Sequence, residues 1–296
     1  MPRADLLDPA VLDPAVLEFD AIGTAWRIDA DAPIPDEARA AVARRIDRFD
    51  RDWSRFRDDS LVAEIARSGG TRVLPPEGAA LFALYRRLYD LTDGRVSPFV
   101  VGSLARLGYG PVPPADGASG PPPAWDGLAS LVGNELTTTA PTLIDVGAAG
   151  KGLLVDLVIG VLHDQGIDDA TVDASGDLRV SGVRRERVAL EHPFDPRRAI
   201  GVVDVSAGAI CASATNRRVW GDGLHHVIDG TTGRPVESVV ATWAVAPTAM
   251  LADGAATALF FSSPAEVYAA TGAIGVRMFS DGRSERHRDF AGELFS

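Results

Sequence analysis

Residues 143–156 (LIDVGAAGKGLLVD) hold the strongest candidate for binding chemistry in this sequence. A strand is predicted over 142–146, and a turn of small residues then opens a helix over about 152–165. Backbone N–H groups at the start of a helix suit an anionic group such as a phosphate. Lys151 lies in this first turn and is the only lysine among 29 basic residues, the others being arginine. Its retention indicates a position that needs a compact ammonium rather than a guanidinium.

The same turn departs from the Walker phosphate-binding loop. Asp145 stands where that loop has its first glycine, and Gly152 stands where it has the Ser or Thr that binds Mg²⁺. A tight strand-to-helix turn without any ligand is the alternative, and the pattern alone does not separate the two interpretations.

Asp253 and Thr257, within 250–261 (MLADGAATALFF), are candidate metal ligands. They are four positions apart and therefore share one face of the helix predicted there. Carboxylate and hydroxyl oxygens are hard ligands that Mg²⁺ accepts, with water or a substrate phosphate completing the shell. The alternative is structural, with the threonine bonded back to a helical carbonyl beside a capping aspartate.

Two further segments carry residues with possible chemistry. His225 and His226 are consecutive, so in a strand they face opposite ways and cannot chelate one metal together. One of them could serve as an acid, base or hydrogen-bond donor, and the alternative is a structural histidine in a hairpin. In 52–65, Trp53 and Phe56 fit a core stripe, although an aromatic ring there could stack on a flat ligand. Ser54, Asp59 and Ser60 could cap helices, and Asp58-Asp59-Ser60 is expected to start the next helix.

The elements that position these residues follow from periodicity. Most are short strands in the second half, and the mixture of helices with mostly antiparallel strands predicts an α+β fold, a layered α/β arrangement. Helices are expected over 36–56, about 77–93 and about 250–261. Strands are expected over about 21–28, 170–174, 188–191, 200–205, 225–229 and 239–246. A hairpin turn is expected at 281–282 and a Pro/Gly-rich loop over 111–123.

Composition excludes several classes of function. The net charge of −12 argues against nucleic acid and anionic membranes as partners. The single cysteine, Cys211, excludes a disulfide framework, and no apolar stretch reaches the length of a membrane span or a signal peptide. We therefore expect a soluble, cytoplasmic chain with a flexible leader over 1–18 and one domain over 19–296.

The order and spacing of these segments resemble the ApbE family of flavin transferases, the FAD:protein FMN transferases. The resemblance spans most of the chain. It is carried by Gly23-Thr24, the aromatic-Ser stretch (Trp53, Ser54, Phe56, Ser60), Asp93-Gly94, the D-x-G-x-x-x-KG-x-x-x-D turn (Asp145, Gly147, Lys151, Gly152, Asp156), Ser175-Gly176-Asp177, the H-x-x-D-x-x-TG-x-P run (His226, Asp229, Gly233, Pro235) and A-D-x-x-x-T (Asp253, Thr257). Two places depart from the family pattern: Ser97 and Phe99 stand where D-x-T is common, and Gly147-Ala148 where Gly-Gly is usual.

The resemblance implies a T-fold-like architecture and a concrete activity. Such proteins bind FAD and a divalent cation, usually Mg²⁺, and transfer FMN to a Ser or Thr of a target flavoprotein, releasing AMP. It assigns Asp253, Thr257 and the carbonyl of Ala148 to the metal, and it places His226 near the diphosphate. By their chemistry, Lys151 would supply positive charge for catalysis and His226 is the first candidate for the catalytic base, with a nearby carboxylate as the second. The residues it assigns to FAD are Ser54, Phe56, Ser60, Asp145, Lys151, Ser213 and His226. Hydrolysis of FAD to FMN and AMP, or flavin binding without turnover, are the alternatives.

Overall fold

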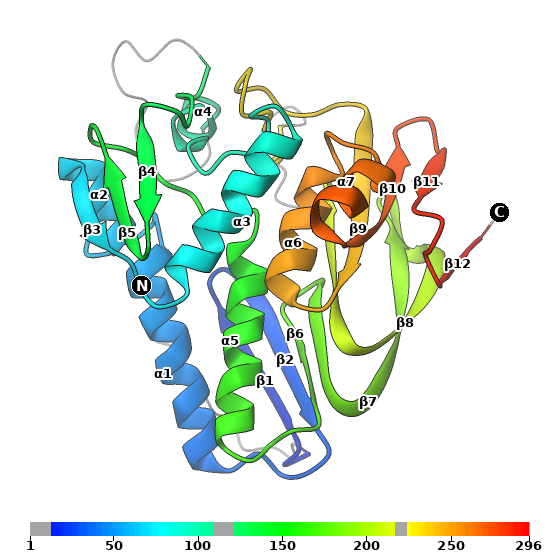
Figure 1. Cartoon of the computed structure of the whole chain (residues 1–296). Helices are drawn as coiled ribbons and strands as arrows, with labels where there is room; N and C mark the ends of the chain where they lie inside the picture. The colour runs from blue at the N-terminus through cyan, green and yellow to red at the C-terminus, as the bar shows by residue number, and fades with distance from the viewer. Residues whose placement is uncertain (1–12, 109–120, 217–223, 296) are drawn as a thin grey trace.

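The structure, a computed structural model, describes residues 13–108, 121–216 and 224–295. Its largest element is a nine-stranded sheet in the order β1-β2-β6-β7-β8-β9-β10-β11, with β12 paired to β8 (Figure 1). Every pairing in it is antiparallel. The strands are β1 Val16–Ala21, β2 Thr24–Ala30, β6 Ala170–Asp173, β7 Asp177–His192, β8 Asp195–Ala214, β9 Val239–Ala246, β10 Ile274–Phe279, β11 Ser284–Arg286 and β12 Glu293–Leu294.

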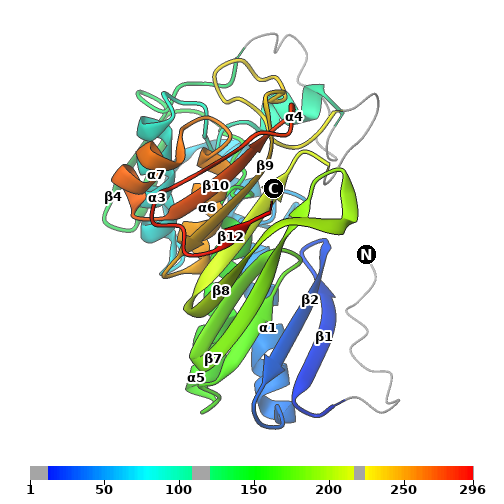
Figure 2. The same ribbon diagram turned by 90° about the vertical axis from the view of Figure 1, so that its right-hand side faces the viewer.

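A layer of helices covers one face of this sheet (Figures 1 and 2). Helix α5 packs on β6 and β7, helix α6 packs on β8 and β9, and the two helices contact each other. Helix α1 packs on the other side of α5, and α3 contacts α6. The bounds are α1 Asp36–Trp53, α3 Gly78–Leu91, α5 Gly150–Asp164, α6 Ala249–Ala258 and α7 Pro264–Thr271. The α+β prediction is therefore confirmed.

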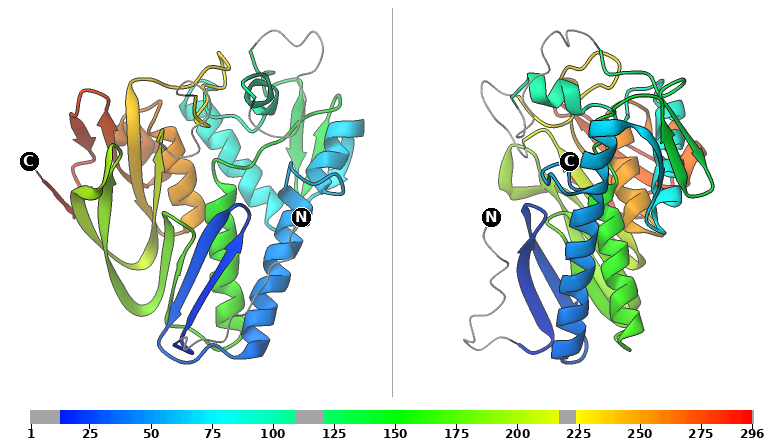
Figure 3. Two further views of the ribbon diagram at one scale, coloured as in Figure 1. Left: turned by 180° about the vertical axis from the view of Figure 1, so that it is seen from behind. Right: turned by 90° about the vertical axis from the view of Figure 1, so that its left-hand side faces the viewer.

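A smaller sheet forms beside these helices (Figure 3). Its three antiparallel strands are ordered β3-β5-β4, and the sequence patterns predicted none of them. Helix α2 precedes β3, and the short α4 lies beyond α3 along the chain. The bounds are α2 Leu61–Ser68, β3 Gly70–Val73, α4 Val101–Arg106, β4 Ala129–Val132 and β5 Glu135–Thr138.

Helix α1 forms as its periodicity predicts. Val42, Phe49 and Trp53 are buried against the core, and each such side chain contributes about 1.5–3 kcal/mol when fully buried. Acidic residues occupy its first turn, where they complement the positive end of the helix dipole. The helix ends at Trp53, three residues before the predicted end, because Ser54 takes an extended conformation. Phe56 therefore lies outside the helix.

Two predicted strands are wrong. Residues 142–146 are extended but belong to no strand, because their amides bind isolated carbonyls: the Thr142 N–H donates to Ile65 and the Asp145 N–H to Pro98. Residues 225–229 form only the isolated bridge between Ile228 and Pro235.

Other predicted boundaries shift without changing the fold. The strands predicted over 188–191 and 200–205 are parts of the long β7 and β8. Strand β1 begins at Val16, inside the segment 1–18 expected as a leader, while residues 1–12 and 109–120 lie outside the described residues.

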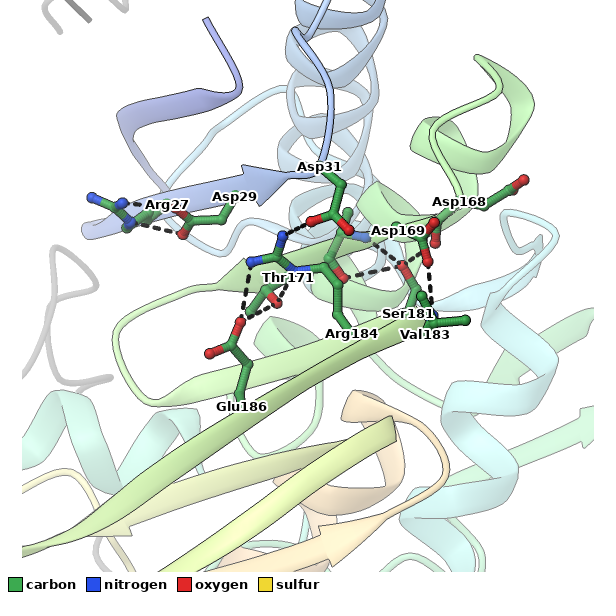
Figure 4. Close-up of polar contacts among 11 residues, drawn as sticks. Arg27, Asp29, Asp31, Asp168, Asp169, Thr171, Ser181, Val183, Arg184 and Glu186 are labelled. Atoms are coloured by element: carbon green, nitrogen blue, oxygen red, sulfur yellow. Dashed lines mark hydrogen bonds and ion pairs between the residues drawn. The ribbon is translucent and has the colours of Figure 1, made fainter. Parts of the chain in front are cut away.

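A β-bulge marks the point where β7 leaves β6. The register of β7 against β8 shifts between Val180 and Arg185, and Gly182 within the bulge has φ of +65°. A Cβ at Gly182 would lie 2.0 Å from Asp169 Oδ1, so only glycine fits. Figure 4 shows the side chains that hold the bulge: Asp169 accepts from the Val183 N–H at 2.7 Å, and the Arg184 guanidinium binds Asp31, Thr171 and Glu186.

No helix in the described part of the chain is long and apolar enough to cross a membrane.

Candidate functional site

The turn over 145–149, which leads into α5, is organised by Asp145. Its Oδ1 accepts from the Gly147 N–H at 2.5 Å, and its Oδ2 lies 2.6 Å from Arg55 Nε. The Arg55 side chain is buried, and its guanidinium lies over the Phe56 ring, 4.3 Å from the ring centroid. Asp145 thus ties this turn to the segment that follows α1.

The hydroxyl of Tyr85 on α3 meets the same turn from the core. It accepts from the Ala148 N–H at 3.1 Å and lies 3.4 Å from the Asp145 carbonyl oxygen, to which it donates. Complete burial raises the pKa of Tyr85 well above its ordinary value, and the nearby charge of Asp145 raises it further. The side chain is therefore a neutral phenol that can donate and accept at the same time.

Helices α5 and α6 approach closely at Gly152. A Cβ at this position would lie 2.2 Å from the carbonyl oxygen of Ala249 and 2.7 Å from Asp253 Cβ, so the contact requires glycine. The Gly152 N–H donates to Asp253 Oδ2 at 2.9 Å. The glycine after the lysine in this motif therefore brings the Asp253 carboxylate to the start of α5.

Asp156, one turn further along α5, holds the start of α6. Its two carboxylate oxygens accept from the N–H groups of Ala249 and Met250 at 2.8 and 2.9 Å, and it pairs with Arg179. Thr248 caps the same helix by accepting from the Leu251 N–H. Asp156 therefore positions the helix that carries Asp253 and Thr257.

Three oxygen-bearing groups meet between α5 and α6. Thr257 Oγ1 lies 3.3 Å from the Ala148 carbonyl oxygen, and Asp253 lies one helical turn before Thr257 with only 7% of its surface exposed. We name Ala148, Asp253 and Thr257 the oxygen cluster. A carbonyl, a hydroxyl and a carboxylate form a donor set of the kind that Mg²⁺ accepts. The structure thus brings together the three groups that the resemblance assigned to a metal.

The oxygen cluster differs from metal sites built on several charged ligands. Within the described residues, no three His, Cys, Asp or Glu side chains gather closely enough to hold a metal ion. A cation bound by this part of the chain would therefore rely on carbonyl and hydroxyl oxygens for part of its shell. Mg²⁺, which keeps several waters and uses one or two carboxylates, fits such a set.

Lys151 reaches from the first turn of α5 toward the Ser175-Gly176-Asp177 motif. Its Nζ lies 2.8 Å from Asp177 Oδ2 and donates to the Ala174 carbonyl at 2.9 Å. Burial alone would lower the pKa of Lys151, but the charges of Asp177 and Asp253 outweigh it and raise the pKa. Cys211 lies directly opposite Asp177 in the β7–β8 pairing, and burial raises the pKa of its thiol well above the ordinary value. The lysine is thus a fixed ammonium beside the oxygen cluster.

The serines of the aromatic-Ser stretch make local contacts. Ser60 is buried and caps α2, accepting from the Ala63 N–H and donating to the Arg57 carbonyl at 3.1 Å each. Ser54 accepts from the Phe56 N–H at 3.4 Å. Phe56 has 47% of its surface exposed, so one side of its ring is open while Arg55 lies over the other. Of this group, the geometry leaves Phe56 best placed to contact a ligand.

The segment containing His226 packs against the Asp93-Gly94 motif. The Gly230 N–H donates to the Arg95 carbonyl at 2.7 Å, and a Cβ at Gly230 would lie 2.6 Å from the Gly94 carbonyl oxygen. Asp229 accepts from the N–H groups of the two following threonines, which closes the turn before Gly233. Two motifs far apart in the sequence are therefore adjacent at this end of the molecule.

His226 and His225 differ in their surroundings. His226 is half-buried, whereas His225 is buried with its Nε2 2.9 Å from the Val236 carbonyl oxygen. Burial lowers the pKa of His225, against the opposite effect of that carbonyl. His225 therefore acts as a neutral structural histidine, which leaves His226 as the candidate acid or base.

Ser213 lies on β8, directly opposite Thr242 of β9, and is half-buried. Its carbonyl accepts from the Thr242 hydroxyl at 3.4 Å. This contact involves the Ser213 backbone alone.

Comparison with known proteins decides the family. The model of the ApbE family matches residues 22–277, which is most of the chain. The chain belongs to the ApbE family. It is 30% identical over 276 residues to the FAD:protein FMN transferase of Klebsiella pneumoniae (strain 342), covering 84% of this chain and 79% of that protein. The protein of the same name from Escherichia coli (strain K12) is also 30% identical, with 84% and 78% covered.

Solved ApbE structures share the fold. The flavin transferase ApbE from Vibrio cholerae superposes with a TM-score of 0.78 at 24% identity, covering 93% of this chain and 97% of that one. The ApbE protein from Thermotoga maritima superposes with a TM-score of 0.79 at 22% identity and the same coverage.

Sequence reasoning missed two residues of this candidate site. Arg55 stands inside the aromatic-Ser stretch but is one of 28 arginines, so its type gave no signal. Tyr85 falls on the apolar stripe of α3 and is fully buried, so its type and spacing indicate a core residue. Only the fold shows that its hydroxyl meets the turn over 145–149.

Proposed function

We propose that this ApbE-family chain is a Mg²⁺-dependent FAD:protein FMN transferase. In the proposed reaction, a Ser or Thr hydroxyl of a target flavoprotein attacks the phosphorus of the FMN half of FAD. A phosphoester bond forms to the acceptor, the diphosphate P–O bond breaks, and AMP leaves. The proposed partners are accordingly FAD and an acceptor flavoprotein.

The class of enzyme follows from the relatives. The curated proteins that match this chain over most of its length are named FAD:protein FMN transferase, and the chain is a transferase of this family. The metal, the acceptor residue and the leaving group are the parts that we propose.

The single observation that supports the metal-dependent reaction best is the oxygen cluster. The Ala148 carbonyl comes from the turn before α5, the Asp253 carboxylate and the Thr257 hydroxyl come from α6, and the two helices touch at Gly152. Once bound there, Mg²⁺ would neutralise diphosphate oxygens and so lower the barrier to attack by an oxygen nucleophile. The cluster lies beside the start of α5, where the positive end of the helix dipole favours the same anionic group.

The other residues take roles that fit their chemistry. Lys151 would add a positive charge near the diphosphate, where negative charge develops in the transition state. His226 would accept the proton of the acceptor hydroxyl as its oxygen attacks phosphorus. Asp145 and Arg55 would hold the turn, and Phe56 would stack its exposed ring face on a flat part of FAD.

The decisive experiment mixes the purified protein with FAD, Mg²⁺ and a flavoprotein subunit that carries a Ser or Thr acceptor. We expect covalent flavin fluorescence on the acceptor in a denaturing gel, with release of one AMP for each flavin transferred. The matched control is the same acceptor with its Ser or Thr changed to Ala. Free FMN and AMP without labelling would instead support hydrolysis, and FAD binding without any product would support a flavin-binding protein.

The first prediction concerns the carboxylate of the oxygen cluster. Asp253→Ala removes the only charged group of the cluster, so we expect FMN transfer to fall by about 100-fold or more. Transfer is measured by acceptor fluorescence over a range of Mg²⁺ concentrations. Asp164→Ala, at an exposed position near the end of α5, is the matched control. Equal activity of the two variants would remove Asp253 from the metal site.

A further inference from the structure

Ala148 has both of its backbone polar groups bound to side chains of other helices. Its N–H donates to the Tyr85 hydroxyl of α3 at 3.1 Å, and its carbonyl lies 3.3 Å from the Thr257 hydroxyl of α6. The residue lies in the turn before α5, where no partner within the helix is available to its N–H. The direction of its carbonyl therefore depends on contacts from outside the turn.

Tyr85 also contacts the other end of this turn. Its hydroxyl lies 3.4 Å from the Asp145 carbonyl oxygen, so a single oxygen atom bridges Asp145 and Ala148. The turn is held from the opposite side by the Asp145 carboxylate, which binds Gly147 and Arg55. Because the hydroxyl both donates and accepts, it fixes the separation of the two ends of the turn.

The hydroxyl of Tyr85 is a polar group buried in the core. The side chain is fully buried, and its ring packs near Phe82 with centroids 6.4 Å apart. A phenylalanine would fill nearly the same volume without the cost of burying a polar group. The hydroxyl is stabilising there only because the turn supplies its two partners.

We infer that Tyr85 is a positioning residue for the oxygen cluster: its hydroxyl holds the turn over 145–149 so that the Ala148 carbonyl faces Thr257. This inference rests on the proposed function for the identity of what the cluster binds. It does not make Tyr85 a ligand, because its hydroxyl binds the N–H of Ala148 and not the carbonyl.

The test compares Tyr85→Phe with Tyr89→Phe. Tyr89 lies one turn further along α3, and its hydroxyl accepts from the Trp125 N–H at 3.3 Å, away from the oxygen cluster. Each variant thus removes one hydrogen-bonding hydroxyl from the same helix. Circular dichroism and the urea midpoint of each variant are measured first, to check that both variants fold.

The first readout is hydrogen–deuterium exchange of metal-free protein. We expect Tyr85→Phe to raise the exchange of the Gly147 and Ala148 amides by about tenfold, since the turn opens locally without its bridge. Tyr89→Phe should leave the exchange of these two amides unchanged. Wild-type exchange in Tyr85→Phe would overturn the inference without any bearing on the metal or on transfer.

The second readout is Mn²⁺ affinity, measured by calorimetry with the metal alone. We expect Tyr85→Phe to weaken binding by about tenfold, as the loss of groups that orient ligands does in other metal sites, while Tyr89→Phe matches the wild type. Equal affinity in Tyr85→Phe and the wild type would overturn the inference. Wild-type protein that binds no Mn²⁺ would refute the proposed metal site itself and, with it, the role of Tyr85 toward a metal.

Discussion

Lys151 is the residue whose chemistry the chain specifies most narrowly. Its ammonium lies between the Asp177 carboxylate and the Ala174 carbonyl, at 2.8 and 2.9 Å. Asp177 is almost fully buried, with 1% of its surface exposed, and Lys151 is its partner in an ion pair. Removing one member of a buried pair leaves the other without compensation. A guanidinium is larger and planar, and cannot take the same place without moving one of these two partners.

We therefore predict that Lys151→Arg lowers FMN transfer although the charge is kept. The longer side chain would shift Asp177 or leave the pocket, and kcat/KM for FAD should fall by about 10-fold to 100-fold. Steady-state kinetics with an acceptor flavoprotein measure this. The control is Arg288→Lys, the reverse exchange at an exposed position. Wild-type kinetics in Lys151→Arg would make the retention of a single lysine a coincidence.

For single residues of the candidate site, the sequence predicted which side chains could do chemistry but not which atoms those side chains contact. The types and spacing of Asp253 and Thr257 sufficed to place them on one helix face. The partners of Lys151, Tyr85 and Arg55 could not be predicted, because each contact joins segments that are far apart in the sequence. These contacts form only when α5 packs on β6 and β7 and when α3 and the segment after α1 reach the turn before α5.

The start of α6 is the element on which the oxygen cluster depends. Asp156 of α5 binds the first two N–H groups of α6, which the helix itself leaves without partners. Thr248, the residue directly before α6, supplies a second cap through its side chain, which accepts from the Leu251 N–H. The orientation of α6, and with it the placement of Asp253 and Thr257, is thus fixed at the start of that helix.

We predict that Asp156→Asn destabilises the protein by about 1–3 kcal/mol, because the amide retains one acceptor oxygen and loses the charge paired with Arg179. Urea unfolding followed by circular dichroism measures the free energy of unfolding. Asp47→Asn is the control: it removes the exposed pair of Asp47 with Arg51, which is worth at most about 1 kcal/mol. A smaller effect at Asp156 than at Asp47 would contradict a capping role.

The predictions of elements succeeded where one pattern determines the outcome. The continuous apolar run of β9 marks a strand buried on both faces, and its bounds were predicted to the residue. The run over 142–146 (TLIDV) is also rich in β-branched and apolar residues but forms no ladder, because its amides bind single carbonyls of other segments. Composition cannot distinguish a strand from an extended segment whose partners are not strands.

The nine-stranded sheet with one layer of helices is the frame of the whole molecule. The mixture of elements predicted an α+β fold, but strand order could not be predicted, because β2 pairs with β6 although helices α1 to α5 lie between them in the sequence. The small sheet of β3, β4 and β5 was missed for another reason. Its strands are four residues long, too short to show alternation clearly.

Unfolding of the whole chain should take up a proton at His225. Burial lowers the pKa of His225 below its ordinary value of 6.5, so the unfolded chain binds this proton more tightly than the folded chain does. The contribution of neutral His225 to stability is therefore complete above about pH 6.5 and is lost as the pH falls through that value.

We predict that the free energy of unfolding falls more steeply between pH 7 and about pH 5 in the wild type than in His225→Gln. Glutamine can still donate to the Val236 carbonyl but does not titrate, and all other groups are common to both proteins. Urea unfolding at a series of pH values gives both curves. Parallel curves would show that His225 has the same pKa in the folded and unfolded chains.

The place of the β1–β2 hairpin in the sheet has a consequence for synthesis. Its inner strand, β2, pairs with β6, so that Arg27 lies opposite Asp173. A ribosome that adds about 5–20 residues per second leaves the edge of β2 without its partner for on the order of ten seconds. An open edge strand invites pairing with other chains. Arg27, Asp29 and Glu18 place paired charges on this hairpin. Charged side chains on an open edge disfavour its pairing with other chains, so these residues protect the protein while it is still being made.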